Sequence, residues 1–271
     1  MVDERTVAYR RHRILELVES IGFVRVSDLS EAMYVSEVTV RSDLAALESQ
    51  GALERVHGGA MPRGVATRAE RSFETERGSA ADEKRRIGRA GAAMVQSGSS
   101  VLLDVGTTTA AVADALLERD DLHDVVVITN GLSIALALEP AIPRFTVVVT
   151  GGTLRPLQHS LVAPYASMLL ARIRADLAFI GCTGVDAGAG VTNVNLPETE
   201  LKRAMLGASD RAVVVADASK LGRTSLGVIG PLDRFELLLT ATPETGADEH
   251  LARLARLESA GLACHTEGMP T

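Results

Sequence analysis

The first fifty residues place apolar side chains at the spacing of an α-helix, in three separate stretches. From Arg10 to Ser20 the apolar positions form one stripe, which predicts a first helix that Gly22 ends. A short β-prone stretch follows. Ser27 is then the expected N-cap of a second, short helix that runs through Met33. The pattern therefore begins with two helices in quick succession.

A third amphipathic stretch follows a turn at Tyr34 and Val35. Ser36 is its expected N-cap and Gly51 its expected end. Its apolar face is expected to contain Val38, Val40, Leu44 and Leu47. Two short helices joined by a tight turn make a helix-turn-helix, whose second member enters the major groove of DNA. The third helix is therefore the predicted recognition helix.

Polar residues at the start of this helix are the candidates for DNA contact. These are Ser36, Glu37, Thr39, Arg41 and Ser42. Arg41 is the best candidate among them, because a guanidinium can reach base edges or phosphates.

The segment after the recognition helix predicts a β-wing. Residues 53–56 have the composition of a strand, and the turn His57-Gly58-Gly59 follows. Arg55 and His57 on this wing could touch the DNA backbone or the minor groove. The alternative is that the helices form a protein-interaction module, although such a module does not require a wing.

A change of pattern divides the chain into a winged helix-turn-helix over 1–60, a linker over 61–83 and a larger domain over 84–271. The linker combines Pro62, Gly64 and Gly78 with scattered charges and lacks apolar periodicity, with room for one short helix. The length of 271 residues also favours two domains.

The larger domain alternates apolar strands with helices. The expected strands are Val101–Leu103, Val125–Thr129, Phe145–Val149, Leu177–Ile180 and Ala212–Ala216. The expected helices are Lys84–Val95, Thr109–Leu117, Leu132–Leu138, Tyr165–Ile173 and Glu198–Leu206. Strands that are apolar at nearly every position predict a parallel sheet covered by helices on both faces. The fold class is therefore α/β.

Small and polar residues follow each of these strands. Ligands of such sheets bind beyond the carboxyl ends of the strands, where glycines admit an anion and hydroxyls and amides donate to it. The candidates are Asp104, Gly106, Thr107, Thr108, Thr109, Thr129, Asn130, Gly151, Gly152, Asp186 and Lys220. Together they favour a phosphorylated sugar or polyol, with Lys220 as the countercharge.

Each strand end alone also has a purely structural explanation. The threonine run could be a plain helix cap, and Gly151-Gly152 could be a tight turn. Lys220 and Glu198 could be solvated surface charges, as most lysines and glutamates are. The prediction depends on all five strand ends being of one kind.

Three motifs resemble the DeoR-family helix-turn-helix: Val24-x-Val-x-x-Leu29, Val35-Ser-Glu-Val-Thr-Val-Arg-Ser-Asp-Leu44 and Leu53-Glu-Arg-Val-His-Gly-Gly-Ala60. One difference is Ser42, where the family commonly has a second arginine. The strand-end residues resemble the DeoR C-terminal sensor, whose fold is related to ribose-5-phosphate isomerase and coenzyme A transferases. This resemblance adds Glu198 to the effector-binding residues.

The resemblance implies a transcriptional regulator, usually a repressor of a sugar or polyol operon that a phosphorylated sugar releases from its double-stranded operator. It covers nearly the whole chain. Operators read by a helix-turn-helix are normally paired half-sites, so a homodimer or homotetramer is expected.

Charge and composition narrow these expectations. The net charge is −7, and residues 1–60 hold seven arginines against ten acidic residues, which argues against indiscriminate nucleic-acid binding. No apolar run is long enough to cross a bilayer and no leader peptide is evident, so a cytoplasmic protein is expected. Cys182 and Cys264 lack disulfide or zinc spacing, and neither a metal nor a cofactor is expected.

A sugar-phosphate isomerase with an appended DNA-binding domain is the alternative function. Such an enzyme needs a general base, for which Glu198 and Asp186 are the carboxylates near the expected pocket. His159 is the histidine nearest a strand end, and a lone loop histidine is more often a hydrogen-bonding residue. Catalysis is therefore not expected.

Overall fold

The computed structural model describes residues 7–21, 24–56, 59–62, 70 and 72–268. The chain divides into two compact units, Met1–Ala69 and Glu70–Thr271, each with its own hydrophobic core. The finer division into 1–60, 61–83 and 84–271 stays a prediction.

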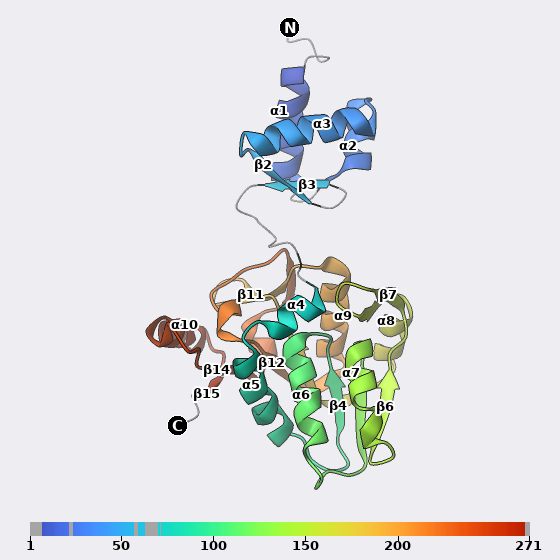
Figure 1. Ribbon diagram of the computed structural model, residues 1–271, viewed down its shortest axis with the longest axis vertical. Coiled ribbons are helices and arrows are strands. Elements are labelled where there is room, and N and C mark those ends of the chain that lie inside the picture. Colours follow the sequence, from blue (N-terminus) through green and yellow to red (C-terminus); the bar gives the residue numbers. More distant parts are fainter. Residues whose placement is uncertain (1–6, 22–23, 57–58, 63–69, 71, 269–271) are drawn as a thin grey trace. The chain divides into compact units, whose positions relative to one another are not determined.

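The N-terminal unit packs three helices against a small antiparallel sheet (Figure 1). Its elements are α1 (Val7–Ile21), β1 (Val24–Arg25), α2 (Val26–Met33), α3 (Glu37–Ser49), β2 (Leu53–Val56) and β3 (Gly59–Pro62). β3 lies between β1 and β2, and Val56 pairs with Gly59. Ile14, Leu29 and Leu44 are fully buried at the centre of the core. This is the expected winged helix-turn-helix.

Two details of the N-terminal unit differ from expectation. Ser27 is not an N-cap, because α2 begins one residue earlier and the Ser27 hydroxyl bonds to Asp28 Oδ1 (3.0 Å). Val38 is not on the buried face: it is 72% exposed, because it lies on the opposite side of α3 from Val40. The predicted cap at Ser36 is confirmed.

The C-terminal unit is built on a seven-stranded sheet in the order β15-β14-β12-β9-β4-β5-β6, and every paired neighbour is parallel. The strands are β4 (Ser100–Leu103), β5 (Val125–Thr129), β6 (Phe145–Val149), β9 (Ala175–Gly181), β12 (Ser209–Val215), β14 (Leu237–Ala241) and β15 (Cys264–Glu267). The five predicted strands are confirmed, and β14 and β15 extend the sheet beyond them.

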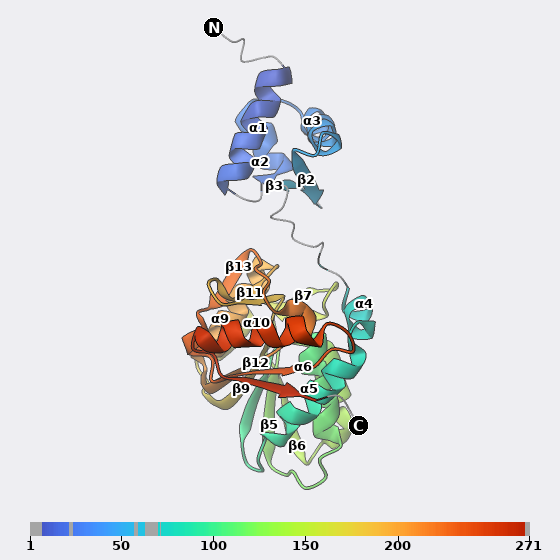
Figure 2. The same ribbon diagram turned by 90° about the vertical axis from the view of Figure 1, so that its left-hand side faces the viewer.

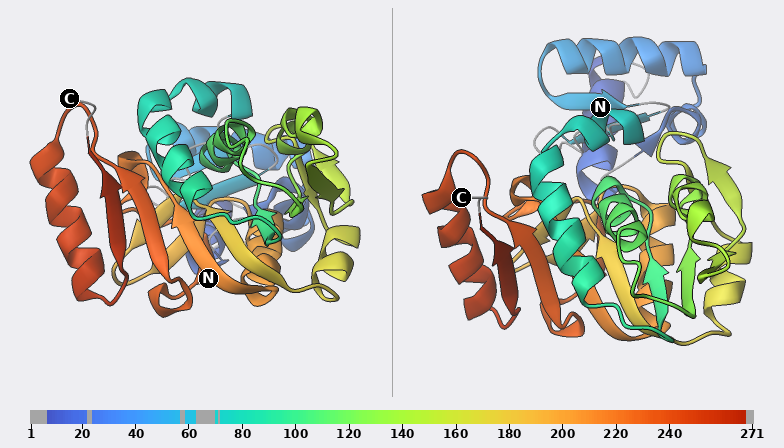
Figure 3. Two further views of the ribbon diagram at one scale, coloured as in Figure 1. Left: turned by 90° about the horizontal axis from the view of Figure 1, so that it is seen from below. Right: turned by 60° about the horizontal axis from the view of Figure 1, so that its bottom comes forward.

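Helices cover both faces of this sheet (Figure 2). They are α4 (Phe73–Gly78), α5 (Ala81–Ala93), α6 (Thr107–Leu117), α7 (Leu132–Ala137), α8 (Tyr165–Leu170), α9 (Leu196–Gly207) and α10 (Ala247–Ser259). Side chains of α5, α6 and α7 pack on one face, and side chains of α8, α9 and α10 pack on the other. Figure 3 shows α5 and α6 on one side of the strands and α9 on the other.

Successive strand residues alternate between these two faces. Leu103 joins the core beneath α5 and α6, whereas Leu102 joins the core beneath α9; Phe179 and Ile180 divide in the same way. Because both faces of the sheet are buried, each strand needs apolar residues at successive positions, as the sequence pattern predicted.

Two small antiparallel sheets were not predicted and border the strand ends. One pairs β7 (Thr153–Arg155) with β8 (Ser160–Val162). The other has the order β10-β11-β13, formed by β10 (Gly184–Asp186), β11 (Gly190–Asn193) and β13 (Gly227–Gly230).

Candidate functional site

The side chains expected to contact DNA lie at the N-terminal end of α3. The Ser36 hydroxyl accepts a hydrogen bond from the Thr39 amide (3.2 Å) and caps the helix. Glu37, Arg41 and Ser42 are exposed, and Thr39 is half-buried. Arg41 Nη2 lies 2.6 Å from Glu37 Oε2, one helical turn away. Because this ion pair with Glu37 is exposed to solvent, Arg41 can leave it to contact DNA.

The two wing candidates are described less fully. Arg55 lies on β2, but its side chain is outside the described residues, as is the whole of His57.

A buried ion-pair cluster fixes α3 against α1. The Asp43 carboxylate on α3 accepts hydrogen bonds from two arginines of α1: from Arg10 Nε on Oδ2 (2.5 Å) and from Arg11 Nε on Oδ1 (2.9 Å). The Asp43 side chain is only 4% exposed. Since both partners come from one helix, this cluster sets how the recognition helix sits on the rest of its unit.

The order of the large sheet places all five predicted strand ends at one edge. β12, β9, β4, β5 and β6 are consecutive neighbours in a parallel arrangement, so their carboxyl ends lie side by side. The polar loops, which are spread from Asp104 to Lys220 in the sequence, therefore meet in one region, as expected of an α/β sheet.

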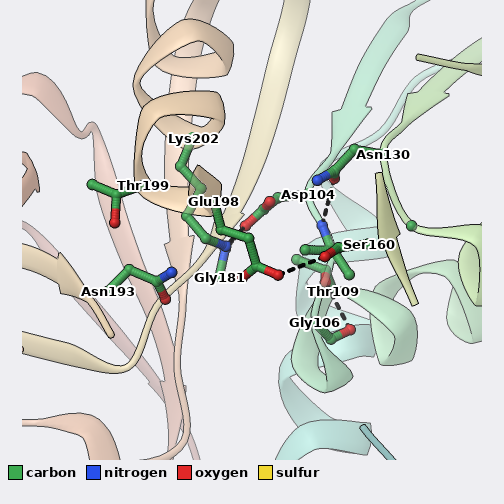
Figure 4. A network of polar contacts seen from close by, with 12 residues as sticks. Asp104, Gly106, Thr109, Asn130, Ser160, Gly181, Asn193, Glu198, Thr199 and Lys202 are labelled. Carbon is green, nitrogen blue, oxygen red and sulfur yellow. Dashed lines mark hydrogen bonds and ion pairs between the residues drawn. The ribbon is translucent and has the colours of Figure 1, made fainter. Parts of the chain in front are cut away.

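Asp104, which follows β4, is the centre of a buried polar cluster (Figure 4). Its Oδ2 accepts a hydrogen bond from the Gly181 amide (3.0 Å) and pairs with the ammonium of Lys202 on α9. Both side chains are almost completely buried. Within the described part of the chain, Asp104 Oδ1 has no hydrogen-bond partner. The cluster thus contains an oxygen that a donor could still satisfy.

The charges of this pair are coupled. Burial disfavours the carboxylate and raises the pKa of Asp104 to about 6, although the Lys202 ammonium opposes this. Burial also disfavours the Lys202 ammonium, but the nearby carboxylates of Asp104 and Glu198 outweigh it and raise the pKa of Lys202. Lys202 is therefore a buried cation at neutral pH.

Glu198, one turn before Lys202 on α9, links the cluster to the β7–β8 hairpin. Its Oε1 accepts a hydrogen bond from Ser160 Oγ (2.6 Å) and pairs with the Arg155 guanidinium. Arg155 Nη2 in turn lies 2.6 Å from Glu70 Oε2, at the start of the C-terminal unit. Burial raises the pKa of Glu70. The chain of contacts therefore runs from the strand ends to the first residue of this unit.

Lys220, the predicted countercharge, pairs with a different carboxylate. Its Nζ lies 3.1 Å from Glu76 Oε2 on α4. The C-terminal end of α4 also contacts the buried Lys84, whose Nζ donates to the carbonyls of Glu76 (2.5 Å) and Ser79 (2.6 Å). Asp217 lies two residues beyond the end of β12, and its Oδ2 is 4.0 Å from Lys84 Nζ. Two lysines thus attach α4 to the strand ends.

Several predicted residues have local structural contacts. Asn130 Oδ1 accepts from the Val105 amide (2.8 Å), and the Thr129 hydroxyl accepts from the Gly131 amide (3.0 Å). The Thr109 hydroxyl donates to the Gly106 carbonyl (2.9 Å). These contacts shape the loops around the cluster.

The threonine run begins α6 but does not supply its cap. The N-cap is Gly106, and among the described residues no side chain caps this helix. The first-turn amides of Thr107 and Thr108 therefore have no side-chain acceptor from the cap residue, and first-turn amides of this kind are the groups that bind anions at helix N-termini.

Asp186 and the glycine pair are explained by backbone geometry. Asp186 Oδ1 accepts from the amides of Gly188 (2.9 Å) and Ala189 (3.0 Å), in the turn between β10 and β11. Gly151 and Gly152 have φ values of 71° and 127°. A Cβ atom at Gly152 would lie 2.0 Å from the Val162 carbonyl oxygen, so glycine is required there.

Sequence reasoning missed Lys202, Arg155 and Ser160. For Lys202 a signal existed: it follows Glu198 by four residues, which places both side chains on one face of α9. Arg155 and Ser160 are brought to the site by the β7–β8 pairing, where they are direct partners. Nothing in the local pattern predicted that hairpin.

Two family models match the chain. The DeoR-like helix-turn-helix domain matches residues 10–62, and the DeoR C terminal sensor domain matches residues 79–242. The chain belongs to the DeoR family. Both halves of the resemblance seen in the sequence are thereby confirmed.

Characterised relatives of this DeoR-family chain are transcriptional regulators. The Glycerol-3-phosphate regulon repressor of Escherichia coli (strain K12) is 30% identical over 235 residues, which covers 86% of this chain and 90% of that protein. The HTH-type transcriptional regulator GlpR of Haloferax volcanii is 34% identical over 233 residues, covering 86% and 89%. This chain is therefore a transcriptional regulator with a DNA-binding helix-turn-helix.

Solved structures similar to this DeoR-family chain include ribose 5-phosphate isomerase A from Methanocaldococcus jannaschii. The match has a TM-score of 0.40 and 18% identity, and it covers 52% of this chain and 55% of that one.

Residues 7–21, 24–56, 59–62, 70 and 72–268 contain no helix long and apolar enough to cross a bilayer. In the same residues, no group of three His, Cys, Asp or Glu side chains is placed to hold a metal ion. Burial raises the pKa of the Cys182 thiol to about 12, so this cysteine is protonated at neutral pH.

Proposed function

We propose that this regulator represses a sugar or polyol operon and that a phosphorylated sugar or polyol, bound at the strand-end cluster, releases it from its operator. The named relatives include a repressor of a glycerol-3-phosphate regulon, which supports an effector of this class. In this proposal the protein acts in the cytoplasm, on double-stranded DNA, and needs no cofactor.

The observation that carries the effector site is the unpaired Asp104 Oδ1. A buried carboxylate oxygen without a donor is costly, and such atoms are rare in folded proteins. A hydroxyl of a bound polyol would donate to this oxygen. Lys202, at the other oxygen of the same carboxylate, would keep the local charge balanced while the ligand is bound.

The phosphate has a separate place in this proposal. The uncapped first turn of α6 offers the amides of Thr107 and Thr108 beside the same strand end, where the helix dipole favours an anion. Lys220 would supply a further positive charge if its pair with Glu76 opened. Asp186, Asn130 and Gly152 would then shape the pocket walls, since their side chains or backbones already hold neighbouring loops.

The contacts that close the cluster suggest how binding reaches the DNA-binding unit. Arg155 pairs with Glu70, and Lys220 pairs with Glu76; the two carboxylates belong to the first and seventh residues of the C-terminal unit. A ligand that competes for either cation would loosen this segment, which follows directly on the N-terminal unit in the chain. The coupling is thus a competition between ligand and protein carboxylates for the same cations.

Catalysis is not part of this proposal. Glu198 is engaged by Arg155 and Ser160, and Asp186 is engaged by two turn amides. His159 is held by Ser133 Oγ (2.6 Å) and Glu74 Oε1 (3.2 Å). A general base must reach a substrate proton, and these groups are already committed to protein contacts.

A homodimer or homotetramer assembled through the C-terminal unit completes the proposal, because paired half-sites require paired recognition helices. Light scattering tests this directly: a monomer at working concentration would contradict it.

The test of the effector site is a thermal-unfolding screen against phosphorylated sugars and polyols, each beside its unphosphorylated parent. A ligand at about 100 times its Kd should add about 2.7 kcal/mol of stability. The same compound should release a duplex selected from a random library by the purified protein. A panel without any stabilising compound would reject the sugar-phosphate effector.

Lys220→Ala should leave affinity for the selected duplex intact and abolish its release by the stabilising compound. The matched variant is Glu76→Gln, which removes the negative charge of the partner of Lys220 without removing the cation. Fluorescence anisotropy of the labelled duplex measures both. If Lys220 serves only to hold Glu76, the two variants will behave alike; a normal response in Lys220→Ala removes Lys220 from the site.

Arg41→Ala should weaken binding to the selected duplex by about 1–3 kcal/mol if Arg41 contacts a base. Glu37→Ala is the control, because it removes the partner of Arg41 while keeping the guanidinium. Unchanged affinity of Arg41→Ala would reject a DNA contact at this position.

A further inference from the structure

Val38 lies at the centre of the outward face of the recognition helix. An α-helix turns by about 100° per residue, so Val38 lies about 160° around α3 from the buried Val40. The exposed Arg41 and Ser42, three and four residues later, flank it on the same face. Val38 is 72% exposed, although an apolar side chain gains nothing from water. Packing within the N-terminal unit therefore does not account for this valine, which is placed beside the side chains expected to contact DNA.

We infer that Val38 reads a thymine by contact with the thymine 5-methyl group. This inference depends on the proposal that α3 lies in the major groove. Residues near the start of such a helix meet base edges, and the thymine methyl is the one apolar group that the major groove presents. Burying the two apolar surfaces against each other is favourable without any hydrogen bond.

The charge of the N-terminal unit makes such a contact valuable for specificity. Residues 1–69 hold nine arginines and no lysine against ten acidic residues, a net charge of −1, so the unit as a whole has no excess of positive charge to attract phosphates. Recognition must then depend on contacts with base edges. An apolar contact discriminates thymine from cytosine and from uracil at no electrostatic cost.

The helix geometry also places the thymine. Val38 and Arg41 are three residues apart, which is about 4.5 Å along the helix axis. A base-pair step is about 3.4 Å. The thymine should therefore lie within one or two base pairs of the position at which Arg41→Ala relaxes sequence preference.

Deoxyuridine replacement tests this inference on the full-length protein. Each thymine of the selected duplex is replaced in turn by deoxyuridine, which lacks only the methyl group. Wild-type protein should lose about fourfold in affinity at one thymine of each half-site, which corresponds to about 0.8 kcal/mol for one buried carbon group. Val38→Ala should bind the thymine duplex several-fold more weakly and should no longer distinguish thymine from uracil there.

Val7→Ala is the matched control, because Val7 is another exposed valine of the same unit, on α1. It should keep full discrimination. The inference is overturned if wild-type protein tolerates deoxyuridine at every position, or if Val38→Ala still discriminates. The deoxyuridine scan changes only the DNA, so it tests the inference on wild-type protein even if Val38→Ala folds poorly. Failure of α3 as the groove-binding helix would appear separately, as unchanged affinity in Arg41→Ala.

Discussion

Replacing Lys202 with methionine is expected to lower the free energy of unfolding of the C-terminal unit by about 3–5 kcal/mol. Lys202 is buried, and its removal leaves the Asp104 carboxylate buried without a counterion. Methionine keeps most of the side-chain volume, so a cavity contributes little. Urea unfolding of the full-length protein, followed by hydrogen exchange of β4 and α9 amides, measures the loss.

The double variant Asp104→Asn/Lys202→Met separates charge from packing. It removes both buried charges, so most of the lost stability should return. Release of the selected duplex by a sugar phosphate should nevertheless stay absent, because the charged carboxylate to which the proposed ligand hydroxyl donates is gone. Arg174→Met is the surface control: its pair with Asp210 is exposed and should be worth about 0–1 kcal/mol. A Lys202→Met loss no larger than this would contradict a buried, structural pair.

The α/β core was predictable because burial on both faces leaves a strong local signal. Strands such as β5 are apolar at successive positions, and the limits found for β5 and β6 are those expected from the sequence. β14 carries the same kind of run, Leu237–Ala241, and could have been predicted too. β15 could not, since Cys264–Glu267 is mostly polar and depends on pairing with β14.

The polar cluster was predictable only in part, because its contacts join residues far apart in the chain. Asp104 was predicted from its place after a strand, but its partner Lys202 is 98 residues away. Arg155 and Ser160 depend on an irregular hairpin without a clear pattern. The position of a polar residue after a strand thus predicts that it lies in the polar cluster, whereas its partner in the cluster is set by tertiary packing.

On the recognition helix, residue type was a poor guide to exposure. Val38 was assigned to the apolar face because it is a valine, although helical spacing puts it opposite Val40. Asp43 was not assigned any role, because aspartate is usually at the surface. The exposure of Val38 and the burial of Asp43 both follow from their places around the helix axis, and neither follows from the hydropathy of the residue.

Replacing Asp43 with alanine is expected to lower the stability of the N-terminal unit by about 3 kcal/mol. This is the lower end of the range for breaking a buried ion pair, because the Arg11 side chain is 29% exposed and water can solvate its charge. Arg10, at 14% exposure, would keep a largely desolvated charge without its partner. Since this cluster joins α1 to α3, operator affinity should fall with it, even though Asp43 faces away from the proposed DNA surface.

Hydrogen exchange of α1 and α3 amides in the full-length protein measures this change without interference from the other unit. Glu37→Ala is the matched control on the same helix, because its pair with Arg41 is exposed and contributes only about 0.2–0.5 kcal/mol. Asp43→Asn should fall between the two, since it keeps hydrogen-bond acceptance but not the charge. Equal protection in Asp43→Ala and wild-type protein would contradict a structural role for this cluster and would show that the position of α3 is set by its apolar residues, Val40, Leu44 and Leu47.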